Sequence, residues 1–274
     1  MENYLRGLIA LSLIISCASA SDLSTINRVS QYQSLSNFTA DSDHVKFALT
    51  NPLHTPLRIS IQTNDLGLKV KFDTITLQPK SDTIFELRHS QKENLKLHLS
   101  ESFGDLNKKI TLEKLDLPFP KGKKYQVIQG YHEKFTHYKS EYSRYAIDFN
   151  LKEDDIVTSA DTGFVVGVVD AYTVYGNDVK YQNFSNFITI YNPDSGIFTQ
   201  YVHLKNGRIF VKVGDQVKRG QKLALTGLSG YMDGEHLHFN VLVPSKKDQL
   251  KSVPIEFKNY KGIELKKFDF VENN

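Results

Sequence analysis

Two histidines stand two residues apart in the strand-like run Gly-Glu-His-Leu-His-Phe, residues 234–239. Successive side chains of a β-strand point to opposite faces, so His236 and His238 face the same side, about 6.6 Å apart along the backbone. Such a pair can form one edge of a metal site or a proton-transfer pair. The pattern alone equally fits two surface histidines on an exposed strand, so its meaning depends on the rest of the chain.

Three segments upstream carry further polar residues inside apolar runs. His203 lies among apolar and β-branched neighbours in the strand-like run 200–204. Asp148 interrupts the apolar run 145–149, and burial of an unpaired carboxylate is costly, so it requires a cation, a metal or a cluster of donors. His137 precedes that run and can reach Asp148 if the intervening residues form a loop.

These four segments, in this order, resemble the lysostaphin-like (LytM-type) zinc endopeptidases of peptidoglycan, in the subgroup with an N-terminal β-domain. The resemblance covers about residues 125–245 and includes the glycine-punctuated hairpin 211–221. The Val-x-x-Gly-Asp pattern of this hairpin also occurs in biotinyl and lipoyl carrier domains. Those domains contain no His-x-His, and no swinging-arm lysine stands at a matching tip here, so we set the carrier interpretation aside.

The resemblance implies a zinc ion held by His137, Asp148 and His238, with a fourth position open for water. Two neutral imidazoles and one carboxylate leave a net charge of about +1, which can lower the pKa of bound water to about 7. The resemblance also implies that His203 and His236 are catalytic. They would orient the water, accept its proton or stabilise the oxyanion, and one sequence does not tell which does which.

The chain departs from the commoner family pattern before the aspartate. Most members place the first histidine four residues earlier, where this chain has Arg144, which cannot bind zinc. The pair Thr136–His137 fits the variant with a Tyr-Ala-Ile-Asp-Phe strand, and His132 is the fallback ligand. Asn186 matches an asparagine that commonly precedes the next strand, and we expect it either to contact substrate or to be a polar residue at a strand end.

The first residues predict export. An apolar run over 8–15, which is too short to span a bilayer, follows Arg6 and precedes Ala-Ser-Ala at 18–20. This pattern predicts a signal peptide over 1–20. Cleavage after Ala20 would remove Cys17, the only cysteine. The alternative is lipoprotein processing, with a lipid anchor at Cys17. We therefore expect a periplasmic or extracellular protein without a transmembrane helix, or a membrane-anchored lipoprotein.

The expected fold class is all-β. With 274 residues the chain is long enough for two modest domains, and its net charge of +3 is too small to indicate nucleic-acid binding. Residues 21–116 are predicted to form a β-sandwich-like domain of about seven strands, whose role stays open. Four of its strands are expected at 45–49, 57–61, 69–72 and 84–87.

The second half is predicted to be a separate domain. The run 117–124 contains two prolines, one glycine and three lysines, and we expect a linker there. An antiparallel β-sheet metallopeptidase domain is expected over 125–245, followed by a C-terminal extension over 246–274. Its clearest strands are predicted at 163–169, 187–191, 198–204 and 236–243.

These features predict an exported zinc metallo-endopeptidase that hydrolyses amide bonds in the stem peptides or cross-bridges of peptidoglycan, with zinc-bound water as the nucleophile. The alternative is a catalytically inert peptidase-like domain that binds cell wall or activates a partner hydrolase. Inert members of the family usually lack one or more zinc ligands, whereas all five polar positions are present here. The sequence leaves open which bond is cut, the oligomeric state and the role of the N-terminal domain.

Overall fold

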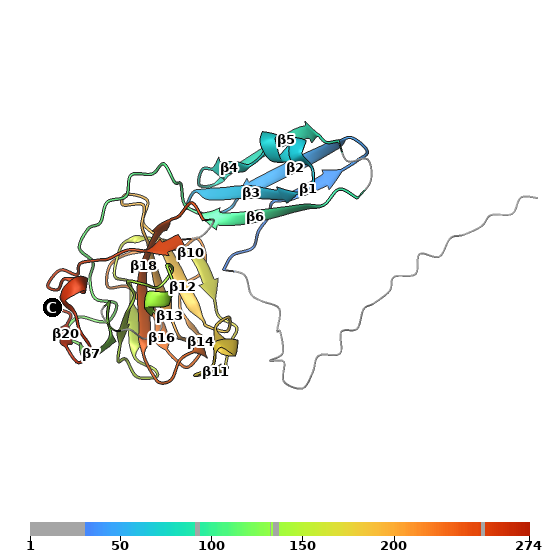
Figure 1. The fold of residues 1–274 in the computed structure, drawn as a ribbon. Coiled ribbons are helices and arrows are strands. Elements are labelled where there is room, and N and C mark those ends of the chain that lie inside the picture. The colour runs from blue at the N-terminus through green and yellow to red at the C-terminus, as the bar shows by residue number, and fades with distance from the viewer. Residues whose placement is uncertain (1–30, 91–93, 132, 134–136, 248–249) are drawn as a thin grey trace, which may run out of the picture.

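The computed structural model describes residues 31–90, 94–131, 133, 137–247 and 250–274, which fold into an N-terminal and a C-terminal body (Figure 1). The predicted signal peptide 1–20, with Cys17, and the fallback ligand His132 lie outside the described residues. None of the helices in the described ranges has the length and apolar character that a bilayer crossing requires. Regular structure is mostly strand, in sheets that are chiefly antiparallel, which confirms the all-β fold class.

Two three-stranded sheets form the N-terminal body. One contains β1 (Asn37–Ala40), β2 (His44–Asn51) and β5 (Ser81–Arg88). The other contains β4 (Thr74–Leu77), β3 (Leu57–Thr63) and β6 (Leu97–Phe103). Val45, Phe47 and Leu49 alternate along β2 and are fully buried, which is the period of two that a half-buried strand requires.

Residues 69–72, predicted to be a strand, lie instead at the end of a short helix. The helix α1 (Leu66–Lys71) begins at Asp65, whose carboxylate accepts a hydrogen bond from the amide of Leu68 at 2.8 Å. Leu68 and Phe72 are four residues apart and both buried, whereas Val70 is 85% exposed. The alternation of lysine with apolar residues hid this helical spacing, so the strand prediction is wrong here.

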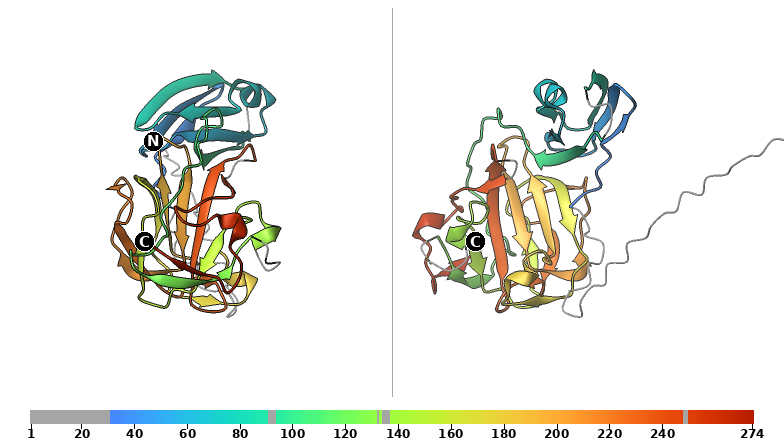
Figure 2. Two further views of the ribbon diagram at one scale, coloured as in Figure 1. Left: turned by 90° about the vertical axis from the view of Figure 1, so that its left-hand side faces the viewer. Right: turned by 45° about the vertical axis from the view of Figure 1, so that its right-hand side comes forward.

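A nine-stranded sheet dominates the C-terminal body (Figure 2). Its strand order is β15-β10-β12-β13-β18-β8-β7-β20, and β19 also pairs with β18. The bounds are β7 (Lys124–Gln129), β8 (Ile147–Phe149), β10 (Gly163–Val169), β12 (Phe187–Tyr191), β13 (Phe198–Val202), β15 (Gln216–Val217), β18 (Leu237–Pro244), β19 (Leu250–Ser252) and β20 (Phe270–Glu272). β10 and β12 begin and end where the sequence predicted.

A smaller sheet of β14 (Leu204–Ile209), β16 (Lys222–Thr226) and β9 (Ile156–Thr158) shares a hydrophobic core with one face of the large sheet. Ile147, Tyr201 and Phe239 from the large sheet are buried in this core. Side chains alternate along each strand, so the residues on either side of these three point to the opposite face. The remaining short elements are β11 (Tyr175–Gly176), β17 (Gly230–Tyr231) and the 3-10 turns η1 (His137–Lys139), η2 (Val179–Tyr181) and η3 (Gly262–Glu264).

The N-terminal body packs on one end of that opposite face. The ring of Phe103 stacks on Phe198 with centroids 5.7 Å apart, and the Arg58 guanidinium donates to the carbonyl of Ser245 at 2.9 Å. Leu242, which pairs with Phe198 across β18 and β13, belongs to the same apolar cluster. Leu237, where β18 starts five residues earlier, belongs to the other hydrophobic core.

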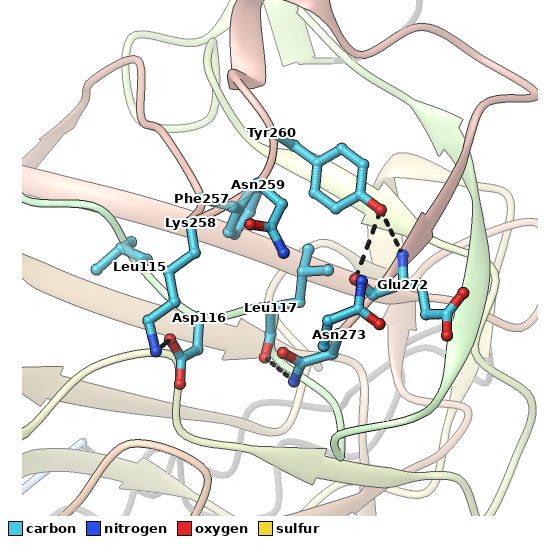
Figure 3. Close-up of a pocket in the computed structure, with 10 residues that line it drawn as sticks. Leu115, Asp116, Leu117, Phe257, Lys258, Asn259, Tyr260, Glu272 and Asn273 are labelled. Atoms are coloured by element: carbon cyan, nitrogen blue, oxygen red, sulfur yellow. Dashed lines mark hydrogen bonds and ion pairs between the residues drawn. The ribbon is translucent and has the colours of Figure 1, made fainter.

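The first residues of the predicted linker, 117–119, are buried. Leu117 and Phe119 belong to the core of the C-terminal body. Figure 3 shows Asp116 beside Lys258, whose Nζ lies 2.6 Å from the Asp116 carboxylate, and Asn273 donating to the carbonyl of Leu117 at 3.3 Å. The structure thus differs from the expectation of a linker over 117–124.

The C-terminal residues also differ from the sequence-based expectation. Within 246–274, predicted to be an extension, β19 pairs with β18 and β20 pairs with β7. Both are short strands of three residues, and short strands at a sheet edge carry too few residues to show a clear period. The large sheet therefore extends beyond the predicted end of the domain at residue 245.

Candidate active site

Three of the predicted site residues form one cluster at the start of β18. Strands β8 and β18 pair antiparallel with Asp148 directly opposite His238, and Nδ1 of His238 donates to Oδ1 of Asp148 at 2.9 Å. His137 begins η1 and places its Nε2 3.2 Å from Oδ2 of Asp148. Each of the three offers one ligand atom, and these atoms all lie within 4.8 Å of one another.

The donor set of this cluster fits a metal ion. Two atoms that bind the same tetrahedral zinc at about 2.1 Å lie about 3.4 Å apart, close to the observed separations between the carboxylate of Asp148 and its two histidines. In the part of the chain that the structure describes, the ion-pair partners of Asp148 are His137 and His238, and no lysine or arginine pairs with it. The cation that this buried carboxylate requires is therefore an imidazolium or a metal.

The electrostatics of the cluster favour the ionised carboxylate. Burial has the largest effect on Asp148 and raises its pKa, but the charges of His137 and His236 together with hydrogen bonds from His137 and His238 outweigh it, so the pKa lies well below the usual range. Burial lowers the pKa of His238 below its usual value. For His137, burial also lowers the pKa, but the adjacent Asp148 carboxylate raises it by more, so the pKa lies above its usual value.

His203 lies where β13 ends and β14 begins. Its φ of +65° is in the left-handed region, which is unusual for a residue other than glycine and frequent at functional sites. The ring Nδ1 donates to the carbonyl of Ser229 at 2.7 Å, which leaves Nε2 as the acceptor atom. Burial, followed by the charges of His236 and His238, holds the pKa of His203 well below its usual value. His203 is therefore a neutral imidazole with a fixed tautomer.

His236 lies beside His203 and has a similar arrangement. Its Nδ1 donates to the carbonyl of Gly234 at 2.9 Å, so Nε2 is again the acceptor atom. The ring centroids of His203 and His236 are 4.6 Å apart, and those of His203 and His238 are 6.1 Å apart. The structure thus brings all five predicted histidine and aspartate positions into one site.

Asn186 is not accessible to a substrate. Its side chain is fully buried, its carbonyl oxygen accepts hydrogen bonds from the amides of Ala171 and Tyr172, and its amide donates to the carbonyls of Tyr172 and Leu204. These contacts use the hydrogen-bonding capacity of a carboxamide. Of the two roles expected for Asn186, the geometry corrects the substrate contact in favour of a structural one, because the residue ties together the loops next to His203.

The sequence-based prediction missed a polar row beside the cluster. Asn240 follows His238 by two residues on β18 and pairs with Gln200 on β13. Tyr142 joins both, because its hydroxyl accepts from Gln200 at 2.8 Å and its carbonyl accepts from Asn240 at 2.6 Å. The row therefore anchors the loop between the first two predicted ligands. The sequence signal for this row was the presence of Gln200 and Asn240 inside two otherwise apolar strands.

Comparison with known proteins identifies the C-terminal body. Residues 142–251 match the model of Peptidase family M23. The peptidoglycan DD-endopeptidase ShyB of Vibrio cholerae is 45% identical over 67 residues, 24% of this chain and 15% of that protein. The glycyl-glycine endopeptidase ALE-1 of Staphylococcus capitis is 31% identical over 116 residues, 42% of this chain and 29% of that protein.

A solved structure of lysostaphin from Staphylococcus simulans shares 27% identity, with 47% of each chain covered and a TM-score of 0.34. The matches to ShyB and ALE-1 span 15% and 29% of those relatives' own lengths, so the likeness concerns one domain of each. Residues 142–251 of this chain are a peptidase family M23 domain, which is the family that the order of the polar segments predicted.

Proposed function

We propose that this chain is an exported zinc endopeptidase that hydrolyses amide bonds in the peptide part of peptidoglycan. The family match supports peptidase activity, and the names of the relatives supply the class of substrate. The observation that carries the metal part is the buried Asp148 carboxylate held between His137 and His238. Export rests on the predicted signal peptide.

In this proposal His137, Asp148 and His238 hold the zinc. A bound zinc ion supplies a Lewis acid that makes water a nucleophile near neutral pH. His203 and His236 each hold their proton on Nδ1 through a main-chain carbonyl, so both present Nε2 as a base. Either imidazole can accept a proton from the attacking water at Nε2 and then donate it to the departing amine. The other can stabilise the oxyanion only in its protonated form, with the added proton on Nε2.

The inert alternative is disfavoured by the same geometry. A domain that only binds cell wall has no need of two buried imidazoles, each with one ring nitrogen held by a main-chain carbonyl, beside a buried carboxylate. All five polar side chains are present and lie in one site. The sandwich-like N-terminal body covers the far end of the sheet face and leaves the start of β18 outside its contact.

Digestion of purified sacculi by the mature protein, with and without added zinc, tests this proposal. We expect new amine and carboxyl ends within the peptide portion, identified by mass spectrometry, and release of these ends about a hundredfold to a thousandfold more slowly by the His203→Ala variant. Cleavage of glycan bonds or of the bond between glycan and peptide alone would contradict an endopeptidase.

A further inference from the structure

Gln129 ends β7 beside the metal cluster. Strands β18, β8 and β7 are neighbours in the large sheet, and the register places His238, Asp148 and Gln129 opposite one another across them. Residues directly opposite on antiparallel strands point to the same face, with Cβ atoms about 4.5–5.5 Å apart. The side chain of Gln129 therefore starts next to that of Asp148, on the side away from His238.

A shift of register produces this arrangement. Val127 pairs with Phe149, and both belong to the hydrophobic core on the other face of the sheet. In a regular strand Gln129 would share the face of Val127, because side chains alternate. The register shifts between these two residues, so that Gln129 rather than Ile128 pairs with Asp148. A bulge of this kind re-aims a side chain and is frequent next to active sites.

The main chain holds Gln129 in place. β7 pairs with β20 on one side and β8 on the other, so it is an interior strand. The amide of the next residue, Gly130, donates to Oε2 of Glu133 at 2.6 Å. A Cβ at position 130 would lie 2.7 Å from the carbonyl oxygen of Leu265, so only glycine allows this close approach. The end of β7 thus has little room to move.

The amide nitrogen of Gln129 is buried and lacks a partner. The residue is 8% exposed, and Nε2 meets no hydrogen-bond acceptor in the part of the chain that the structure describes. Nδ1 of His137 is buried in the same way, but it is a donor when Nε2 of that ring binds a metal, so it cannot accept from the amide. An unsatisfied buried donor is costly and calls for an acceptor in the working site.

The Asp148 carboxylate becomes such an acceptor when zinc is bound. Its Oδ1 accepts from Nδ1 of His238, and its Oδ2 lies 3.2 Å from Nε2 of His137. Among the described residues no other donor contacts this carboxylate. A ring nitrogen whose lone pair binds a metal carries no proton, so neither imidazole can then donate to Asp148. One carboxylate oxygen binds the metal, and the other needs a new donor.

We propose that Gln129 is a positioning residue whose amide donates to the Asp148 oxygen that does not bind zinc. The inference rests on the proposed function, because it concerns the same site. The hydrogen bond keeps the carboxylate from binding zinc through both oxygens and so leaves the fourth position open for water. Loss of an outer partner of this kind typically costs about tenfold to a hundredfold in metal affinity.

The test measures the zinc affinity of the mature protein by competition with a chromophoric chelator. Gln129→Met keeps the length of the side chain and removes the donor, so it should raise the zinc dissociation constant about tenfold to a hundredfold. Thr158→Val on β9 is the matched control, because Oγ1 of Thr158 is also buried without a partner in the described residues. It should leave the constant unchanged. An unchanged constant in Gln129→Met would overturn the inference.

Thermal denaturation separates a positioning role from a packing role. In the presence of a chelator the amide has no hydrogen bond to lose, so Gln129→Met should melt at or above the wild-type temperature. With saturating zinc the variant should melt below wild type, because the hydrogen bond to Asp148 is absent. The same difference from wild type with and without zinc would show that Gln129 serves packing alone and would overturn the inference.

The wild-type protein separates this inference from the proposed function. Failure of wild type to bind zinc would overturn both, whereas zinc at the cluster with full affinity in Gln129→Met would overturn only the role of Gln129. In crystals of the zinc-loaded protein we expect Nε2 of Gln129 within about 3.2 Å of the Asp148 oxygen that does not bind zinc. An amide that faces away from this oxygen would contradict the inference and leave the peptidase proposal intact.

Discussion

Histidine has different partners in the two regions of the site. One region is the proposed zinc cluster of His137, Asp148 and His238, and the other is the pair of His203 and His236. In the cluster, His137 and His238 both contact the carboxylate of Asp148. In the pair, His203 and His236 each donate a proton to a main-chain carbonyl. A carboxylate favours positive charge nearby, whereas a carbonyl fixes one tautomer of a neutral ring. The hydrogen-bond partner of each imidazole, rather than the imidazole itself, therefore distinguishes the proposed cation site from the proposed pair of bases.

The largest expected effect comes from breaking the cluster. His238→Ala should lose both zinc and hydrolysis of sacculi, because two remaining ligands hold zinc poorly. Elemental analysis and product release, measured on the same preparation, check this. His98→Ala, at an exposed position on β6, is the control and should keep both. One full zinc per chain in His238→Ala would show that the metal lies elsewhere.

Breaking the pair should have a smaller and different effect. His203→Ala and His236→Ala should keep about one zinc per chain and lose about a hundredfold to a thousandfold in rate, which is typical for a general base or an oxyanion donor. Hydrolysis near the wild-type rate by both variants, with full zinc, would mean that the pair is not catalytic. Loss of zinc from either variant would erase the distinction between the two regions.

Replacement of Asn186, which holds the loops next to His203, should affect stability more than substrate binding. Asn186→Ala removes a carboxamide that satisfies four main-chain groups, so we expect a loss of about 1–3 kcal/mol in the free energy of unfolding. Urea denaturation checks this beside Asn206→Ala, an exposed asparagine that should change stability by less than about 0.5 kcal/mol. Unchanged stability with a raised KM would instead restore Asn186 as a substrate contact.

The two regions should also differ in their response to pH in metal-free protein. The folded-state pKa of His203 is depressed, so its contribution to stability is present above pH about 6.5 and is lost as pH falls toward the folded pKa. That of His137 is raised, so its contribution is present below pH about 6.5 and is lost as pH rises through the folded pKa.

Denaturation between pH 5 and 8 in the presence of a chelator measures this difference. Relative to wild type, His203→Gln should flatten the fall in stability below pH 6.5, by up to about 1.4 kcal/mol per pH unit, whereas His137→Gln should flatten the loss of stability as pH rises above 6.5. Parallel curves for wild type and both variants would show that neither ring titrates differently on folding.

The sequence predicted the parts of the site that lie within strands. The strand-like runs 145–149 and 234–239 contained Asp148 and His238, and period-two signals also gave the bounds of β10 and β12. His137 is harder to predict, because its position depends on a loop held by Tyr142 and Asn240, nearly one hundred residues apart. The matched family region begins at residue 142, after His137.

The parts that could not be predicted depend on packing between distant segments. The helix α1 was mistaken for a strand because the burial of Leu68 and Phe72 becomes visible only when both contact the N-terminal core. The segment 117–124 seemed too rich in proline and lysine to pack, yet Phe119 is buried against the sheet. The pairing of β19 with β18 was also missed, because a strand of three residues shows no clear period.

The most direct test of the two-region account is anomalous diffraction at the zinc edge from crystals of the zinc-loaded protein. The account predicts one peak within about 2.2 Å of Nε2 of His137, the carboxylate of Asp148 and Nδ1 of His238. A peak bound to His203, or one confined to the exposed group around Asp43, with none at the cluster, would contradict it.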